Sequence, residues 1–190
     1  YPYYPKILNE VQKIATNGFF TVFVKKKYSE ANNFDSVFNL NSRAVKFQQV
    51  ITFDSIPNNC GGVDTLSSFC YSGKKAGLVL PNTEWGFNYK IENLKCLNDA
   101  PSVLKVKAFF ASKAELQECL LFVSIKSGDK DILFKANDLQ YFNIGNNWSS
   151  KELIFNIPKI DEQQSVLSVV IWNRGKNTLY YDDFEIEVFQ

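Results

Sequence analysis

Histidine is absent from the 190 residues of the chain, and several kinds of chemistry are excluded with it. Imidazole is the commonest general base near neutral pH and a principal metal ligand. A Ser-His-Asp triad, a Cys-His pair and an HExxH zinc site therefore cannot form here. An excess of one charge is missing as well, because 21 basic side chains stand against 20 acidic ones. This balance gives no reason to expect a nucleic-acid partner.

Cysteine motifs and long apolar runs that mark other protein classes are also missing. The four cysteines include no CxxC pair, so neither a zinc ribbon nor a thioredoxin-like redox site is expected. In an oxidising compartment Cys60 and Cys70 would close a short loop. The even count also permits a second disulfide between Cys96 and Cys119, and the alternative is that the cysteines are buried free thiols. No apolar run approaches the roughly 18 residues that cross a bilayer.

The sequence does contain a succession of β-strand patterns. Aromatic and β-branched runs are separated by turn residues at intervals of roughly ten residues, which is typical of an antiparallel sandwich. Helical periodicity is found at residues 5–15. We therefore predict an all-β fold: an antiparallel β-sandwich over residues 45–190, preceded by a short N-terminal extension over residues 1–44 that carries this helical pattern. The expected strands are 18–24, 45–53, 77–80, 85–91, 103–110, 119–125, 132–134, 153–157, 166–172 and 180–189.

Four motifs occur in an order that resembles a known family. They are a strand ending in Phe-Asp, an aromatic-Ser-Gly-Lys turn leading into a strand, a tryptophan followed about ten residues on by Ile-Pro, and a last strand with two adjacent aspartates. Together they resemble the galactose-binding-like jelly rolls, particularly carbohydrate-binding modules of the cellulose- and xylan-binding type, over about residues 45–190. The residues concerned are Thr52-Phe53-Asp54, Cys70 to Leu78, Trp148 with Ile157-Pro158, and Val170 to Asn173 with Tyr180 to Ile186.

The resemblance implies a structural Ca²⁺ between the first and last strands. The matching positions are Asp54, Asp182 and the turn Ser72–Lys75, where Ser72 and Lys75 would offer backbone carbonyls. Ca²⁺ takes about six to eight oxygen ligands from carboxylates and backbone, so this set is chemically suitable. Strand alternation places Asp182 on the same face as Phe184, where a carboxylate needs a partner. A salt bridge to the lysines of the turn, or an exposed position at the start of the strand, is the alternative.

Carbohydrate-binding modules stack sugar rings on exposed aromatic side chains. The candidates here are Trp85, Tyr89, Tyr141 and Trp172, with Arg174 as a polar neighbour. Trp85 stands at a strand entrance, and Tyr89 shares its alternation and would extend the same platform; Phe87 would join them only if no bulge intervenes. For each aromatic residue the alternative is a place in the core.

These observations predict a non-catalytic, carbohydrate-binding-like module of a larger extracytoplasmic protein, located outside the cell, in the periplasm or at the cell surface. Its partner would be a glycan or polysaccharide. The chain begins with Tyr1 rather than Met, which favours a processed or excised part of a longer polypeptide. Enzyme activity is not expected, because no two carboxylates suggest a glycosidase pair. The alternative is a structural or protein-interaction β-sandwich domain of a cell-surface or membrane-anchored protein, with no sugar site.

Overall fold

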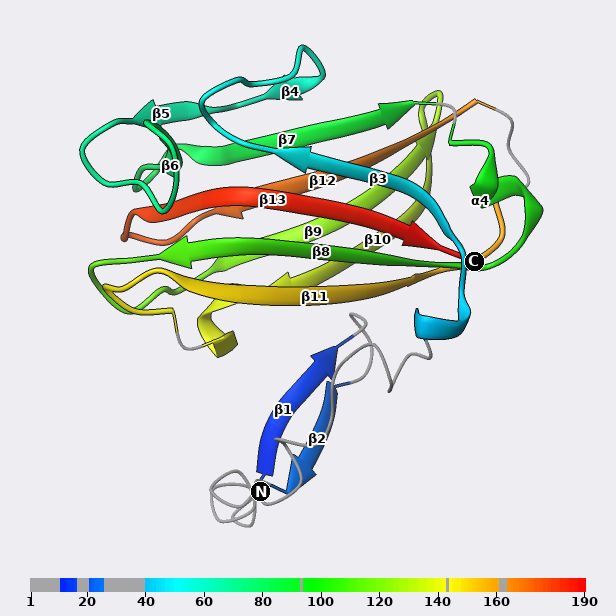
Figure 1. Ribbon diagram of the computed structural model, residues 1–190, viewed down its shortest axis with the longest axis horizontal. Helices are drawn as coiled ribbons and strands as arrows, with labels where there is room; N and C mark the ends of the chain where they lie inside the picture. The colour runs from blue at the N-terminus through cyan, green and yellow to red at the C-terminus, as the bar shows by residue number, and fades with distance from the viewer. Residues whose placement is uncertain (1–10, 17–20, 26–39, 93, 143, 161–163) are drawn as a thin grey trace.

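Two antiparallel sheets packed face to face make up the sandwich in the computed structural model, with β13 and β8 in the front layer of Figure 1 and β9 and β10 behind. The structure describes residues 11–16, 21–25, 40–92, 94–142, 144–160 and 164–190. The first sheet has the order β10 (Lys130–Asp138), β9 (Cys119–Ser127), β12 (Ser165–Asn173), β7 (Glu84–Glu92) and β4 (Cys60–Gly61). The predicted all-β sandwich is confirmed.

The second sheet has the order β11 (Ser149–Ile157), β8 (Ser102–Ala111), β13 (Leu179–Phe189), β6 (Ala76–Val79) and β5 (Asp64–Leu66). An additional strand, β3 (Val45–Ile51), pairs with the second half of β13. Short helices η1 (Leu40–Ser42), α4 (Cys96–Asp99) and η2 (Leu139–Phe142) lie in the connections. Within the described residues, no helix has the length and apolar character needed to span a membrane.

The N-terminal helix is a wrong prediction for the part of it that the structure describes. Val11–Thr16 is a strand, β1, which pairs antiparallel with β2 (Thr21–Lys25). The segment is rich in β-branched residues, and the ladder with β2 outweighs a weak helical periodicity. Residues 5–10 of the predicted helix lie outside the described residues.

The sandwich also takes in residues that were assigned to the N-terminal extension. Leu40 of η1 is buried in a small apolar cluster with Val103, Ile154 and Phe189. These three residues come from β8, β11 and β13, so η1 packs against the six-stranded sheet.

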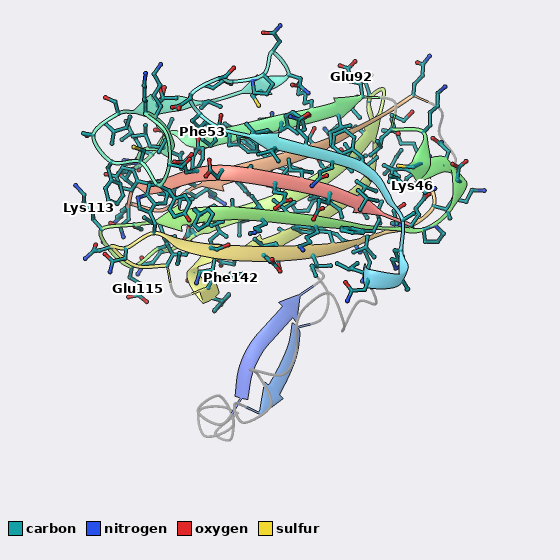
Figure 2. The ribbon with its side chains drawn as sticks, in the orientation of Figure 1. Lys46, Phe53, Glu92, Lys113, Glu115 and Phe142 are labelled. Carbon is teal, nitrogen blue, oxygen red and sulfur yellow. The ribbon has the colours of Figure 1, made fainter. Side chains whose placement is uncertain are left out.

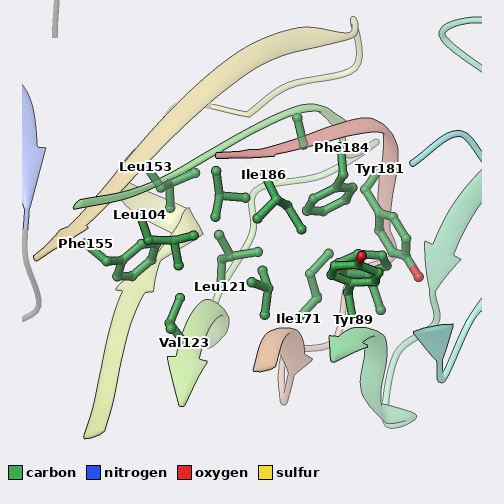
Figure 3. Packing of buried hydrophobic residues seen from close by; sticks show 14 of the residues in the cluster. Tyr89, Leu104, Leu121, Val123, Leu153, Phe155, Ile171, Tyr181, Phe184 and Ile186 are labelled. Carbon is green, nitrogen blue, oxygen red and sulfur yellow. The ribbon is translucent and has the colours of Figure 1, made fainter. Parts of the chain in front are cut away.

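The main core lies between the sheets and receives side chains from both (Figure 3). Its aromatic part surrounds Phe53, which follows β3 and is buried (Figure 2). Phe53 makes edge-to-face contacts with Phe87, Tyr181 and Phe184 at centroid distances of 5.2 to 6.3 Å. Other core residues labelled in Figure 3 are Tyr89, Leu104, Leu121, Val123, Leu153, Phe155, Ile171 and Ile186.

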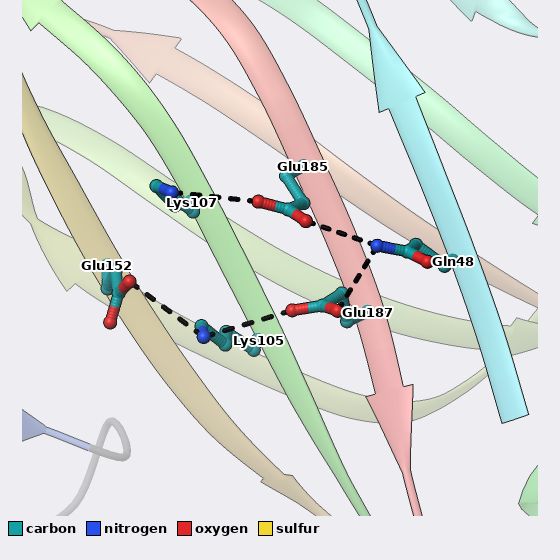
Figure 4. A network of polar contacts seen from close by, with 6 residues as sticks. All are labelled: Gln48, Lys105, Lys107, Glu152, Glu185 and Glu187. Carbon is teal, nitrogen blue, oxygen red and sulfur yellow. Dashed lines mark hydrogen bonds and ion pairs between the residues drawn. The ribbon is translucent and has the colours of Figure 1, made fainter. Parts of the chain in front are cut away.

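The outer face of the six-stranded sheet carries a ladder of alternating charges across β11, β8 and β13 (Figure 4). The Lys105 Nζ lies 3.8 Å from a carboxylate oxygen of Glu152 and of Glu187, and the Lys107 Nζ lies 3.8 Å from a carboxylate oxygen of Glu185. Gln48 of β3 donates to Glu185 at 3.1 Å. Such surface pairs contribute little stability, but they keep this part of the face hydrophilic. The outer face of the five-stranded sheet is different in kind.

Candidate ligand-binding groove

A β-bulge in β7 decides which side chains face outward on the five-stranded sheet. Gly86 and Phe87 together stand opposite Ile171 of β12, so the strand alternation shifts by one residue at that point. Trp85 therefore pairs with Trp172 on the outer face, while Phe87 points into the core. The segment directly after β4 packs tightly on the bulge. A Cβ on Gly62, whose φ is +65°, would lie 2.2 Å from the Gly86 carbonyl oxygen.

Three side chains form a layered platform at one end of this face. Trp85 is 52% exposed and stacks on Trp172, with centroids 5.5 Å apart and an interplanar angle of 10°. The Arg174 guanidinium lies 5.2 Å from the Trp172 ring, within the range of a cation–π contact. Because Trp172 is in contact with both neighbours, Trp85 is the ring that remains open for stacking.

Two phenylalanines continue the aromatic surface across the sheet. Phe122 of β9 makes an edge-to-face contact with Trp85, with ring centroids 6.2 Å apart. Its ring centroid lies 5.0 Å from that of Phe134 of β10. Phe134 is 56% exposed, although it stands in the middle of a strand. An aromatic side chain that is left this open on a rigid strand is well placed to contact a ligand.

Between these aromatic residues lies an open groove of about 710 Å³. Its floor carries small side chains: Ser168 and Val170 of β12, and Ser124 of β9. The polar side chains are Asn88, Lys90 and an exposed ion pair, Lys126 with Asp131 at 3.1 Å. The groove therefore combines aromatic side chains at its sides with a floor of serine and valine side chains.

Two buried polar atoms of this face lack a hydrogen-bond partner among the described residues. They are the side-chain oxygen Oδ1 of Asn88, an acceptor, and the indole Nε1 of Trp172, a donor. Buried polar groups are normally hydrogen-bonded to protein or to ordered water. Of these two residues, Asn88 lines the groove, and Trp172 is stacked on Trp85 beside it.

The structure brings together three of the five predicted ligand-binding residues: Trp85, Trp172 and Arg174. Tyr89 is corrected to a core position, since it is 4% exposed and stacks on Phe87. The bulge at Gly86 and Phe87 is the reason, because it reverses the alternation that was expected to align Tyr89 with Trp85. Tyr141 is 66% exposed, but it lies on η2, outside the groove.

A second bulge, in β13, corrects the expected orientation of Asp182. Asp183 has a φ of +47°, and it stands with Phe184 opposite a single residue of β8. As a result Asp182 pairs with Phe109 and lies on the outer face of the six-stranded sheet, opposite to Phe184. Asp182 is nevertheless buried, because the turn around Tyr71 covers it.

The two predicted calcium ligands hold the same turn through backbone hydrogen bonds. Asp182 Oδ2 accepts from the N–H groups of Tyr71 and Ser72 at 3.0 and 3.2 Å. Asp54 Oδ1 accepts from Lys74 and Lys75 N–H, both at 2.8 Å. The turn thus meets both carboxylates with backbone N–H donors, and among the described residues no ion pair joins either carboxylate to a lysine of the turn.

The donor set of this turn is compatible with a hard cation. Asp182 Oδ2 and Asp54 Oδ1 each accept two N–H groups, which occupies both of their lone pairs, so the acceptor capacity for a cation lies on the other oxygens, Asp182 Oδ1 and Asp54 Oδ2. Within the described residues, no group of three or more acidic or thiol side chains gathers around one point, so backbone carbonyls of Ser72–Lys75 would have to complete the site. Desolvation by burial is the main cause that raises the pKa of Asp182, with the nearby Asp183 carboxylate adding to it.

All four cysteines are free thiols in the structure. Burial raises the pKa of Cys60 to about 11 and that of Cys119 to about 12. Both thiols are therefore protonated at neutral pH, whereas the thiolate is the nucleophilic form. Of the two states left open by the sequence, the structure has the free-thiol one.

Comparison with solved structures finds carbohydrate-binding modules, the class that the sequence motifs resemble. The CBM22-1 xylan-binding domain of Paenibacillus barcinonensis Xyn10C is 13% identical, with 78% of this chain and 96% of that chain covered and a TM-score of 0.45. The C-terminal family 22 module of Clostridium thermocellum Xyn10B is 17% identical, with coverage of 74% and 91% and a TM-score of 0.47. Family 16 carbohydrate-binding module-2 is 12% identical, with 68% of this chain and 86% of that chain covered and a TM-score of 0.42. No family model and no curated protein matches the sequence.

Proposed function

We propose that this domain binds a glycan in the groove on the outer face of its five-stranded sheet, without cleaving it. The observation that carries this proposal is the pair of exposed aromatic side chains, Trp85 and Phe134, on either side of a floor of small polar residues. Both stand on strands, so the groove is formed before the ligand arrives and little entropy is lost on binding.

The chemistry of the groove suits a sugar ring better than a fully apolar ligand. A pyranose has an apolar C–H face, which packs on an aromatic ring, and a rim of hydroxyl groups, which need hydrogen-bond partners. Trp85 offers the ring, while Asn88, Ser124 and Ser168 offer hydroxyl and amide groups close by. The unpartnered Oδ1 of Asn88 adds an acceptor for a sugar hydroxyl.

Binding without catalysis is proposed because the groove lacks the means to break a glycosidic bond. Glycoside hydrolysis ordinarily uses two carboxyl groups on either side of the scissile bond. Among the described residues, Asp131 is the one acidic residue that lines the groove, and its carboxylate is paired with Lys126. Since polysaccharides are mostly extracellular, we place the domain outside the cytoplasm, as part of a longer polypeptide.

A binding screen tests the proposal. The purified domain is titrated by isothermal calorimetry with a panel of polysaccharides, and the mixtures are assayed for newly released reducing ends. We expect micromolar to millimolar affinity for at least one glycan and no release of reducing ends. Absence of binding across the panel would contradict the proposed function, and released reducing ends would contradict its non-catalytic character.

We also propose that Asp54 and Asp182, with carbonyls of Ser72–Lys75, hold a structural Ca²⁺. An ion that binds only the folded state at about 100 times its Kd adds about 2.7 kcal/mol of stability. A chelator should then lower the melting temperature of the wild type, and Asp54→Asn should remove this sensitivity. Asp64→Asn, an exposed change on β5, is the control and should keep it. Superimposable melting curves with and without chelator would disprove the calcium site.

A further inference from the structure

We infer that the groove takes an anionic glycan, with a carboxylate or sulfate group at Lys90. This inference rests on the proposed glycan-binding function and specifies the ligand of the same groove. Its basis is the uneven distribution of donors and acceptors along the outer face of the five-stranded sheet.

Strand register arranges the relevant residues in lines across the sheet. One line runs through Lys90, Ser168, Ser124 and Phe134, because Ser168 pairs with both Lys90 and Ser124, and Ser124 pairs with Phe134. An ammonium and two hydroxyl groups thus lie side by side, next to an exposed aromatic ring. A lysine ammonium donates three hydrogen bonds and accepts none, whereas each serine hydroxyl can both donate and accept. All three groups of this line can therefore donate to one acceptor.

Among the described residues, two lysines line the groove, Lys90 and Lys126, and Lys90 is the one without an ion pair; Glu92 lies two residues further along β7 on the same face. Lys126 and Asp131 in the adjacent line neutralise each other at 3.1 Å. Glu92 lies at the end of β7 and does not line the groove (Figure 2). In the part of the chain that the structure describes, no ion pair includes Lys90. A carboxylate or a sulfate can accept hydrogen bonds from this unpaired ammonium and from both hydroxyl groups, and it supplies the negative charge that a neutral hydroxyl lacks.

Distance separates the anionic group from the stacked sugar. On β12, Trp172 pairs with Trp85 and Ser168 pairs with Lys90. These two residues of β12 are four positions apart. At about 3.3 Å per residue this is about 13 Å, more than the width of one sugar ring. The charged unit is therefore a different sugar from the one that stacks on Trp85, so the ligand is an oligomer rather than a monosaccharide.

Matched pairs of glycans test the inference. Each neutral polysaccharide of the panel is compared with its C6-carboxylate form and its sulfate ester, and polygalacturonate is compared with its methyl ester. For at least one pair, we expect the anionic form to bind about tenfold more tightly at low salt, with the preference falling as salt is added. The carboxylate and sulfate forms together show which anion is recognised.

Variants locate the effect. Lys90→Gln should abolish the preference for the anionic form while binding of the neutral form persists, and Lys90→Arg should retain it. Lys46→Gln removes the same charge from an exposed position on β3, in the other sheet (Figure 2), and should leave the preference unchanged. Equal affinity within every pair, or an equal effect of Lys90→Gln and Lys46→Gln, would overturn the inference while glycan binding itself stands. If no glycan binds at all, the proposed function fails and this inference fails with it.

Discussion

Replacing Phe184 with alanine is expected to lower the free energy of unfolding by about 3–5 kcal/mol, because the change removes a large side chain from a packed core. Phe184 is fully buried and stacks on Phe87 with a centroid distance of 4.2 Å. It also contacts Phe110 edge to face at 5.9 Å, so it joins β7 of one sheet to β8 of the other. The cavity would open at the point where the two sheets meet.

Urea denaturation of Phe184→Ala and Phe134→Ala measures this effect against a matched control. Both variants lose the same atoms, but Phe134 is 56% exposed and its truncation should cost less than about 1 kcal/mol. Comparable losses for the two variants would show that Phe184 does not occupy the packed position described here.

The strands were largely predictable from the sequence because most of them face the core with one side only. In β8, for example, Lys105 and Lys107 alternate with Leu104, Val106 and Phe110. The structure places the lysines on the outer face and the apolar residues in the core. A period of two is the direct consequence of a sheet with one buried and one solvated face.

The faces of the functional residues were not predictable to the same extent, because bulges interrupt the alternation. Counting by twos from Trp85 leads to Tyr89, whereas the bulge in β7 turns Tyr89 into the core. The same error arises in β13, where counting back from Phe184 assigns Asp182 to the wrong face. In both strands a marker exists in the sequence, a glycine at position 86 and a pair of aspartates at 182 and 183, since residues of these kinds tolerate irregular backbone.

Phe122 and Phe134 were missed for a different reason. Each lies in a continuous apolar run, Leu120 to Val123 and Ile132 to Phe134, in which no polar residue marks the outer face. Such a run is ordinarily typical of a strand buried on both sides. On this sheet the outer apolar residues line the groove instead, which is the pattern that an exposed apolar surface with a binding role produces.

The most direct test of glycan binding in this groove is a titration of Trp85→Ala beside Tyr141→Ala. Both variants remove an exposed aromatic side chain, but Trp85 belongs to the groove and Tyr141 lies on η2. A tryptophan at the centre of a binding surface commonly contributes about 2 kcal/mol, which corresponds to a change in Kd of about thirtyfold. We expect Trp85→Ala to weaken binding of the best glycan by at least this factor, with an unchanged melting temperature, and Tyr141→Ala to bind like the wild type. Wild-type affinity in Trp85→Ala, or an equal loss in Tyr141→Ala, would contradict the groove as the binding site.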